Sequence, residues 1–110
     1  MRKIYVLTKR PGYTPRHVWV SNNLEALQNA VGGYIETVTV ATDLVILCDE
    51  EGRLKDKPQN CTICGVDFVG DIVICGVSGE DFSDLPCDWD TMKRLFPQLW
   101  TEPKKQEDQS

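Results

Sequence analysis

The sequence lacks the features that mark several common protein classes. It has one histidine among 110 residues, and no apolar run approaches the roughly 18 to 20 residues of a membrane-spanning helix. The N-terminal stretch MRKIYVLTKRPGY has a basic start, but its apolar part is too short for a signal peptide. At 41% apolar the chain is neither a disordered tail nor a disulfide miniprotein. We therefore expect a cytoplasmic protein without a membrane span.

The five cysteines do not predict a disulfide framework, because the count is odd and the expected compartment is reducing. The sharpest local pattern is Cys61-Thr62-Ile63-Cys64-Gly65, since a CxxCG turn forms one half of a zinc knuckle. The second half is missing, because no other CxxC occurs among the remaining candidate ligands Cys48, Cys75, Cys87 and His17. We expect ordinary half-buried thiols and no cofactor, with a structural zinc at Cys61 and Cys64 or a redox dithiol as alternatives.

Enzymatic chemistry finds little support in the residues. Cysteine–histidine catalysis needs the two side chains in contact, and His17 lies in a predicted strand beside Trp19. The acidic residues sit side by side on predicted turns, whereas glycosidase chemistry needs two carboxyl groups that face each other across a cleft. Gly32 and Gly33 follow a predicted helix, and phosphate-binding glycine loops precede one. The sequence therefore predicts a non-enzymatic protein.

Charge is unevenly spread along the chain. The formal net charge is -5, yet residues 1–20 hold five basic residues and no acidic one, which leaves seven basic and seventeen acidic residues in the remainder. A net acidic chain is repelled by nucleic acids at long range, so we expect no direct nucleic-acid binding. The acidic part either serves solubility or meets a basic partner.

The first half of the chain has clear signals for strands and one helix. Residues 3–8 and 17–20 predict a hairpin around Pro11-Gly12, with a loop of about six to eight residues. Asn22, followed by Glu25, approximates a capping box for a short helix, and Gly32-Gly33 ends it. Residues 34–40 and 42–48 are rich in β-forming side chains and joined by a short link, so they predict an antiparallel pair.

The second half predicts fewer elements. Residues 53–60 are expected to form a charged loop, and residues 70–77 predict the last strand. A closing helix over residues 88–95 places Trp89, Met92 and Leu95 on one face, and Pro97 ends it. Together the elements predict an α+β fold over residues 1–100: a small two-layer sandwich in which two short helices cover one face of a mostly antiparallel sheet of about five strands. Residues 101–110 are expected to be a disordered polar tail.

Several segments resemble the domain-of-unknown-function 3846 family. These are residues 24–28 (LEALQ), 31–36 (VGGYIE), 48–52 (CDEEG) with Leu54, and 58–60 (PQN), and the resemblance extends over roughly residues 4–99. The family consists of small proteins common in Gram-positive bacteria, their phages and their mobile elements. The resemblance implies that setting and no settled activity.

The expected function follows from the small size, the acidic bulk and this resemblance. We expect a binding protein that inhibits a bacterial defence system by occupying a host protein such as a defence nuclease, with nucleic-acid mimicry as one way of doing so. The expected partner-binding residues are Asp49, Glu50, Glu51, Glu80, Asp81 and Asp84.

Two alternatives stay open at the level of sequence. One is a small-ligand or nucleotide-signal binder, because phosphate groups favour the basic end of the chain. Its expected ligand-binding residues are Arg2, Lys9, Arg10, Arg16 and Trp19. The other is a zinc-stabilised interaction module. The sequence leaves the oligomeric state open, a dimer included.

Overall fold

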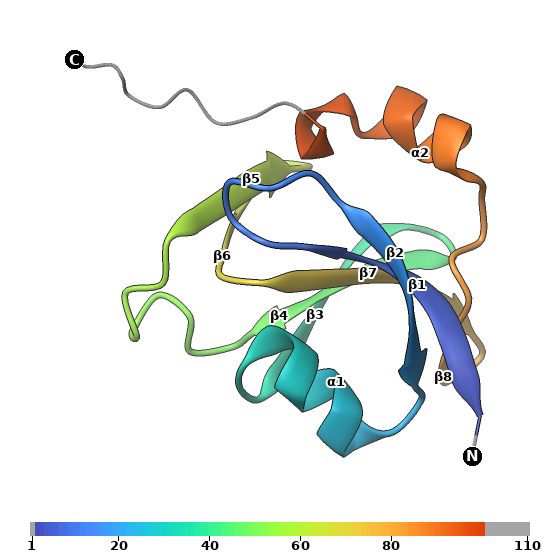
Figure 1. The fold of residues 1–110 in the computed structure, drawn as a ribbon, viewed down its shortest axis with the longest axis horizontal. Coiled ribbons are helices and arrows are strands. Elements are labelled where there is room, and N and C mark those ends of the chain that lie inside the picture. The colour runs from blue at the N-terminus through green and yellow to red at the C-terminus, as the bar shows by residue number, and fades with distance from the viewer. Residues whose placement is uncertain (1, 101–110) are drawn as a thin grey trace.

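The fold is built on an antiparallel sheet with strand order β2-β1-β7-β4-β3, in which β8 also pairs with β7. The computed structural model describes residues 2–100. The strands are β1 (Lys3–Lys9), β2 (Arg16–Ser21), β3 (Ile35–Ala41), β4 (Leu44–Asp49), β5 (Gln59–Ile63), β6 (Val66–Val69), β7 (Ile72–Ser78) and β8 (Asp81–Ser83). The helices are α1 (Leu24–Val31), α2 (Trp89–Leu95) and the 3-10 turn η1 (Pro97–Leu99). Figure 1 shows α1 and α2 at opposite ends of the view, with β5 beside η1.

The predicted α+β class, the mostly antiparallel sheet and the two short helices are confirmed, with six strands in the main sheet rather than about five. Strand β4 is buried at all six positions, as its unbroken apolar run predicts. Both faces of this strand are covered because alternate residues point to opposite sides of the sheet. Val45 and Leu47 share one core cluster with α1, and Leu44 and Ile46 share the other with α2.

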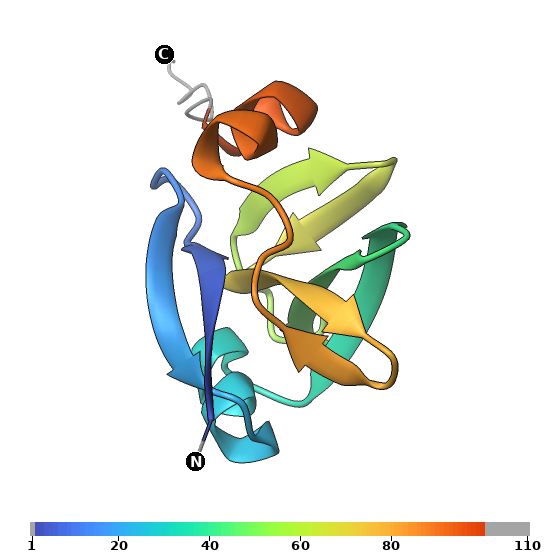
Figure 2. The same ribbon diagram turned by 90° about the vertical axis from the view of Figure 1, so that its right-hand side faces the viewer.

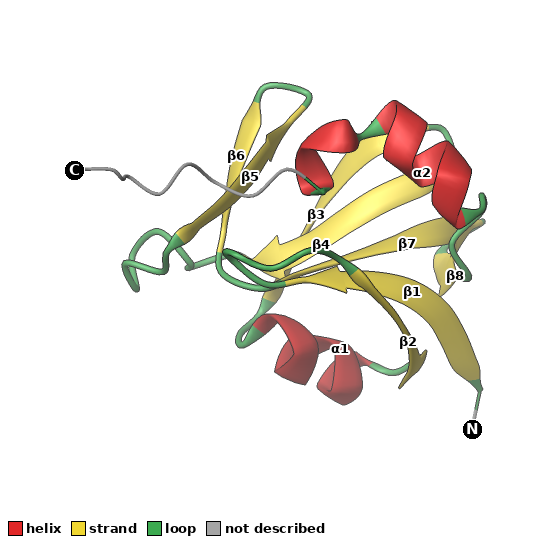
Figure 3. Ribbon diagram, turned by 45° about the horizontal axis from the view of Figure 1, so that its top comes forward, coloured by secondary structure: helices red, strands yellow, loops and turns green. Residues whose placement is uncertain are grey.

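The prediction that both helices cover one sheet face is wrong, because α1 and α2 lie on opposite faces (Figure 3). Helix α1 follows the edge strand β2 after two linking residues. It packs Leu27 and Val31 on the sheet face that carries Val45 and Leu47. Before α2 begins, the chain passes along β1, where the backbone N–H of Leu85 donates to the carbonyl of Tyr5 at 2.8 Å. That crossing carries α2 to the other face, where Met92 is fully buried.

A separate two-stranded hairpin, β5–β6, spans residues 59–69, where we predict no strand, and it overlaps the expected charged loop of residues 53–60 only at its first two residues. Its turn is Cys64-Gly65, and both residues have positive φ, 52° and 78°. Two central residues with positive φ are characteristic of a type I′ turn, which matches the twist of a hairpin. Ile63 and Phe68 of this hairpin are buried in the core beneath α2. Figure 2 shows the hairpin between the C-terminal helices and the β3–β4 pair.

The ends of the helices follow local sequence closely, with two corrections. Asn23, not Asn22, is the N-cap of α1, and its side chain accepts from the N–H of Ala26 at 2.8 Å. Gly32 ends α1 in the left-handed conformation at φ 80°, as predicted. Leu95 of α2 is 58% exposed rather than packed, and Phe96 joins the core instead. Pro97 opens η1 immediately after α2. The predicted polar tail lies outside the described residues.

Candidate functional site

A buried ionic cluster joins the end of α1 to the end of β4. The carboxylate of Asp49 lies 2.8 Å from the ammonium groups of both Lys55 and Lys57, and its side chain is 1% exposed. Lys57 also donates to the carbonyl of Val31 at 3.1 Å, and Lys55 to that of Gly32 at 3.3 Å. The two lysines therefore neutralise Asp49 and also bind the carbonyl groups at the C-terminus of α1, where cations are favoured.

This cluster holds Asp49 in its ionised form. Burial by itself raises the pKa of Asp49, but hydrogen bonds from Lys55, Lys57 and the N–H of Glu51 outweigh burial and lower that pKa well below its usual range. The carboxylate is therefore charged at neutral pH and fully engaged by its neighbours. Asp49 is not part of an exposed acidic surface, contrary to the role we predict for it.

The other predicted acidic residues form two groups at opposite ends of the sheet. Glu50 and Glu51 are exposed where β4 ends, and Glu80 and Asp81 are exposed at the turn between β7 and β8. Because Leu47 pairs with Val73 and Leu44 with Gly76 in antiparallel register, these two positions lie at opposite ends of the strands. Asp84 is exposed near the second group, and its carboxylate accepts from the N–H of Tyr5 at 2.8 Å. The structure therefore does not bring the six predicted acids into one surface.

The predicted basic set is also divided. Lys9 is 2% exposed, and its ammonium donates to the carbonyls of Arg10 at 3.2 Å and Tyr13 at 2.8 Å. Arg2 precedes the start of β1, whereas Arg10 and Arg16 flank the loop at the other end of the strand. Arg10 and Arg16 line one pocket. Burial lowers the pKa of Lys9, although nearby Cys61 acts in the opposite direction. Lys9 thus supports the loop from inside and does not face a ligand.

The CxxCG segment has a structural explanation in the β5–β6 hairpin. Cys61 is buried in the core, and burial raises the pKa of its thiol to about 11, while Cys64 is exposed at the turn. Thiols bind zinc as thiolates, which a raised pKa disfavours. Among residues 2–100, histidine, cysteine and acidic side chains form no group of three or more that could hold a metal ion.

An aromatic surface crosses from the edge strand β2 to α2, and it is the most extended candidate binding site. Trp19 and Tyr5 have ring centroids 4.9 Å apart, Tyr5 stacks on His17 at 4.7 Å, and His17 contacts Trp89 at 4.5 Å. Trp89 meets the edge of Trp100 at 5.2 Å. We call these five residues the aromatic surface. Its outer end is Trp19, which is 61% exposed.

The strand register builds this surface. Tyr5 pairs with Trp19 and Leu7 pairs with His17, so Tyr5, His17 and Trp19 point to the same face of the sheet as α2. Helix α2 then supplies Trp89, and the end of η1 supplies Trp100. Sequence alone indicates that His17 and Trp19 share a face, because they are two residues apart in a strand. It does not indicate that Tyr5 lies opposite Trp19 or that α2 crosses here.

His17 occupies the centre of this surface, between Tyr5 and Trp89. Burial among these rings lowers the pKa of His17 below its usual value of 6.5. The imidazole is therefore neutral at pH 7 and stacks as an aromatic ring. The structure assigns the lone histidine a packing role in this surface.

Family comparison agrees with the motifs in the sequence. The family described as Domain of unknown function (DUF3846) matches residues 1–97. The chain belongs to this family. The comparisons with curated proteins and with solved structures found no match. Among residues 2–100, no helix has both the length and the apolar character needed to cross a membrane.

Residues of the segments that carry the DUF3846 resemblance lie in the ionic cluster and in a buried hydrogen-bonded contact between β5 and β1. Gly32 and Gly33 come from the segment 31–36 and Asp49 from the segment 48–52. The segment 58–60 supplies Asn60, whose buried amide donates to the carbonyls of Lys9 at 2.9 Å and Gly70 at 2.7 Å. These motif residues therefore hold α1, β4, β1 and the β5–β6 hairpin together.

Proposed function

We propose that this protein is a small non-enzymatic binding protein of a phage or mobile element that inhibits a bacterial defence system by occupying a host protein. The observation that carries the proposal is the aromatic surface, with Trp19 exposed at its outer end. Tryptophan and tyrosine are enriched among the residues that contribute most to protein–protein binding, because they bury a large area with few rotatable bonds.

The geometry of the aromatic surface supports this use. The ring of Trp19 packs against Tyr5, and Tyr5 in turn stacks on His17, so these rings are placed before a partner arrives, which lowers the entropy lost on binding. Trp89 and Trp100 connect the strand residues to the core beneath α2. A partner that contacts Trp19 therefore meets a rigid surface rather than a mobile loop.

Acidic groups beside this surface favour a basic partner such as a defence nuclease. Asp84 is bonded to the backbone of Tyr5, and Asp88 and Asp90 are exposed at the start of α2. Acids around an aromatic centre steer a basic partner and add specificity at the rim of an interface. We therefore assign contact to the aromatic surface and a steering role to the acids, in place of mimicry by one acidic patch.

The proposal is tested in host strains that each carry one defence system. Expression of the chain is expected to raise phage plaque counts at least about tenfold in a strain whose system it inhibits. Binding of the purified chain to the nuclease of that system is then measured by calorimetry. Trp19→Ala is expected to weaken binding by at least about 2 kcal/mol, roughly thirtyfold in Kd.

The matched control is Tyr34→Ala, because Tyr34 is 65% exposed and lies outside the aromatic surface. It is expected to bind like the wild type. Equal inhibition by the wild type and Trp19→Ala would remove the aromatic surface from the mechanism. Unchanged plaque counts in every strain of the panel would argue against an inhibitor of those systems.

A further inference from the structure

The loop between β1 and β2 is exposed, and hydrogen bonds hold its backbone in one turn. Arg10, Pro11, Gly12 and Tyr13 form a turn closed by the N–H of Tyr13, which donates to the carbonyl of Arg10 at 3.1 Å. Gly12 has φ 82°, as a turn with proline and then glycine at its centre requires. The buried ammonium of Lys9 donates to the carbonyls at both ends of this turn. The loop therefore presents its side chains on a fixed backbone.

One side of this loop forms a pocket of about 230 Å³, which we call the loop pocket. Two guanidinium groups and three hydroxyl groups line it, from Thr8, Arg10, Tyr13, Thr14 and Arg16. Arg16 lies directly across from Thr8 in the β1–β2 ladder. Guanidinium groups bind phosphate oxygens with paired hydrogen bonds, and hydroxyl groups add further donors.

The positive charge of the loop pocket is not neutralised within the described chain. Among residues 2–100, the ion pairs within 4.0 Å are those of Asp49 with Lys55 and Lys57. Arg10 lies over the ring of Tyr13, with its guanidinium carbon 5.2 Å from the ring centroid, so its charge remains available to a ligand. Lys9 adds a buried positive charge beneath the turn. The pocket is therefore a local basic site in an acidic protein.

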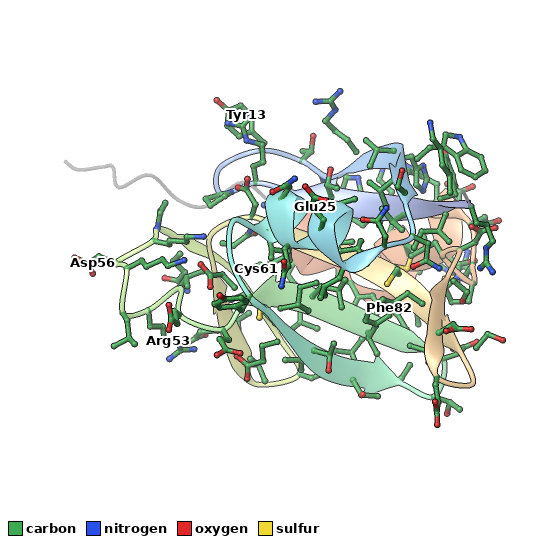
Figure 4. The ribbon with its side chains drawn as sticks, turned by 90° about the horizontal axis from the view of Figure 1, so that it is seen from below. Tyr13, Glu25, Arg53, Asp56, Cys61 and Phe82 are labelled. Carbon is green, nitrogen blue, oxygen red and sulfur yellow. The ribbon has the colours of Figure 1, made fainter. Side chains whose placement is uncertain are left out.

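A second pocket of about 340 Å³ shares Arg10 and Tyr13 with the first, and we call it the side pocket. Pro11 and Pro58 give it apolar surface, and Asn29 and Asp71 give it polar groups. Tyr13 is 61% exposed and projects from the body of the protein (Figure 4). An aromatic ring and a carboxylate are groups that contact a base and the hydroxyls of a ribose.

We propose that the loop pocket and the side pocket together bind a nucleotide, with its phosphate between Arg10 and Arg16 and its nucleoside along Tyr13 and Asp71. This site is separate from the aromatic surface, so the inference goes beyond the proposed inhibition and does not depend on it. The phosphate is the group that the loop pocket recognises most strongly, because the guanidinium groups of Arg10 and Arg16 line this pocket. The nucleoside adds affinity through contact with Tyr13, which lines both pockets.

Calorimetric titration of the purified chain with adenosine 5′-monophosphate, adenosine and inorganic phosphate tests the proposal. The nucleotide is expected to bind at least about tenfold more tightly than either fragment, because each fragment fills one pocket. Arg10→Ala with Arg16→Ala is expected to weaken nucleotide binding at least about tenfold, through loss of charged hydrogen bonds. Asp71→Asn is expected to weaken binding of the nucleotide and leave that of inorganic phosphate unchanged.

Arg2→Ala is the matched control, since it removes an exposed arginine at the other end of β1 and is expected to leave the Kd unchanged. Arg10→Lys with Arg16→Lys keeps the charge but removes the paired donors, and it is expected to fall between the wild type and the alanine variant. All these positions are exposed, except the half-buried Asp71, and urea midpoints confirm that each variant folds. Undetectable nucleotide binding at millimolar concentration, or binding that survives loss of both arginines, would overturn the proposal. Equal affinity for the nucleotide and for inorganic phosphate would overturn its nucleoside half.

Discussion

Gly33 and Asp49 are packed so closely that a Cβ atom on Gly33 would lie 2.5 Å from Oδ1 of Asp49. The absence of a side chain at Gly33 leaves room for the carboxylate at the end of β4. Lys55 and Lys57 then approach the same carboxylate and the last carbonyls of α1. The pair of glycines therefore has two roles: Gly32 ends the helix in a left-handed conformation, and Gly33 makes space for the ionic cluster.

Asp49→Asn is expected to destabilise the fold by about 3 kcal/mol, because breaking a buried ion pair leaves charged or polar groups without their partner. The value lies at the lower end of the usual range, since the side chains of Lys55 and Lys57 are 41% and 22% exposed and regain water. Urea denaturation at pH 7 measures the change in the free energy of unfolding.

The free energy of unfolding at acidic pH provides a second measurement of the role of Asp49. The folded-state pKa of Asp49 is lowered, so its contribution is complete above the unfolded value of about 3.8 and is lost as the pH falls below it. Asp49→Asn is expected to flatten the stability profile below pH 4. Asp56→Asn, an exposed acid of the same loop, serves as the control and should leave both readouts within about 0.5 kcal/mol of the wild type. Equal effects of the two substitutions would contradict the buried cluster.

Gly33→Ala is expected to destabilise the fold by about 1–3 kcal/mol, because the added methyl group overlaps the Asp49 carboxylate. The cause is steric and local, so it should depend on what occupies position 49. In an Asp49→Ala background the same substitution is expected to cost less, and the double-mutant cycle should show coupling of about 1 kcal/mol or more.

Gly12→Ala is the comparison for this cycle, since a Cβ at Gly12 meets nothing within 4 Å but its φ is 82°. Its cost comes from the backbone and should be independent of position 49. Additive effects of Gly33→Ala and Asp49→Ala would show that the cost of Gly33→Ala does not come from overlap with the Asp49 carboxylate.

Local signals in the sequence predict the elements whose ends depend on neighbouring residues. The glycine stop of α1, the turn at Pro11-Gly12 and the buried strand β4 all follow from nearby chemistry. The hairpin β5–β6 is missed for two reasons. Strand β6 has four residues, which are too few to show alternation. The CxxCG pattern also fits both half of a zinc site, which needs a second pair of ligands, and a type I′ turn, which needs a partner strand.

The site depends on contacts between distant residues, which the sequence does not reveal. Three consecutive acids at the end of the apolar run are expected to be solvated, yet the first of them, Asp49, is the last buried residue of β4. Lys55 and Lys57 follow it by six and eight residues, and their return to Asp49 depends on the path of the loop. The aromatic surface likewise depends on strand register and on which face α2 covers.

Cys64→Asn is expected to raise the free energy of unfolding by roughly 0.5–1 kcal/mol. Asparagine adopts positive φ more readily than other residues with a side chain, and Asn-Gly is a favoured type I′ turn. Cys64→Val is expected to lower it by about 1 kcal/mol or more, because a β-branched side chain is strained at φ 52°. Thermal or urea denaturation of the two variants measures both changes.

A zinc site predicts a different pattern for these two variants. If Cys64 held a structural metal, both substitutions would remove a ligand and both would destabilise the fold to a similar degree. Metal analysis of the wild-type chain by mass spectrometry completes the test. One zinc per chain together with equal losses in the two variants would contradict the turn interpretation.

The stability of the fold is expected to decrease between pH 7.5 and pH 5 because of His17. Burial lowers its folded-state pKa, so the unfolded chain takes up a proton first as the pH falls through 6.5. Stability therefore falls below pH 6.5 and stops falling once the pH is below the folded-state pKa, where both states carry the proton. His17→Gln removes the titrating group and should give a flat profile over this range, at a lower stability because the ring contacts with Tyr5 and Trp89 are lost. Urea midpoints at pH 7.5, 6.5, 5.5 and 5.0 distinguish the two profiles, and tryptophan fluorescence reports on the three tryptophans of the aromatic surface together. This window lies above that of Asp49, so a decrease that persists in His17→Gln would assign the pH dependence to a group other than His17.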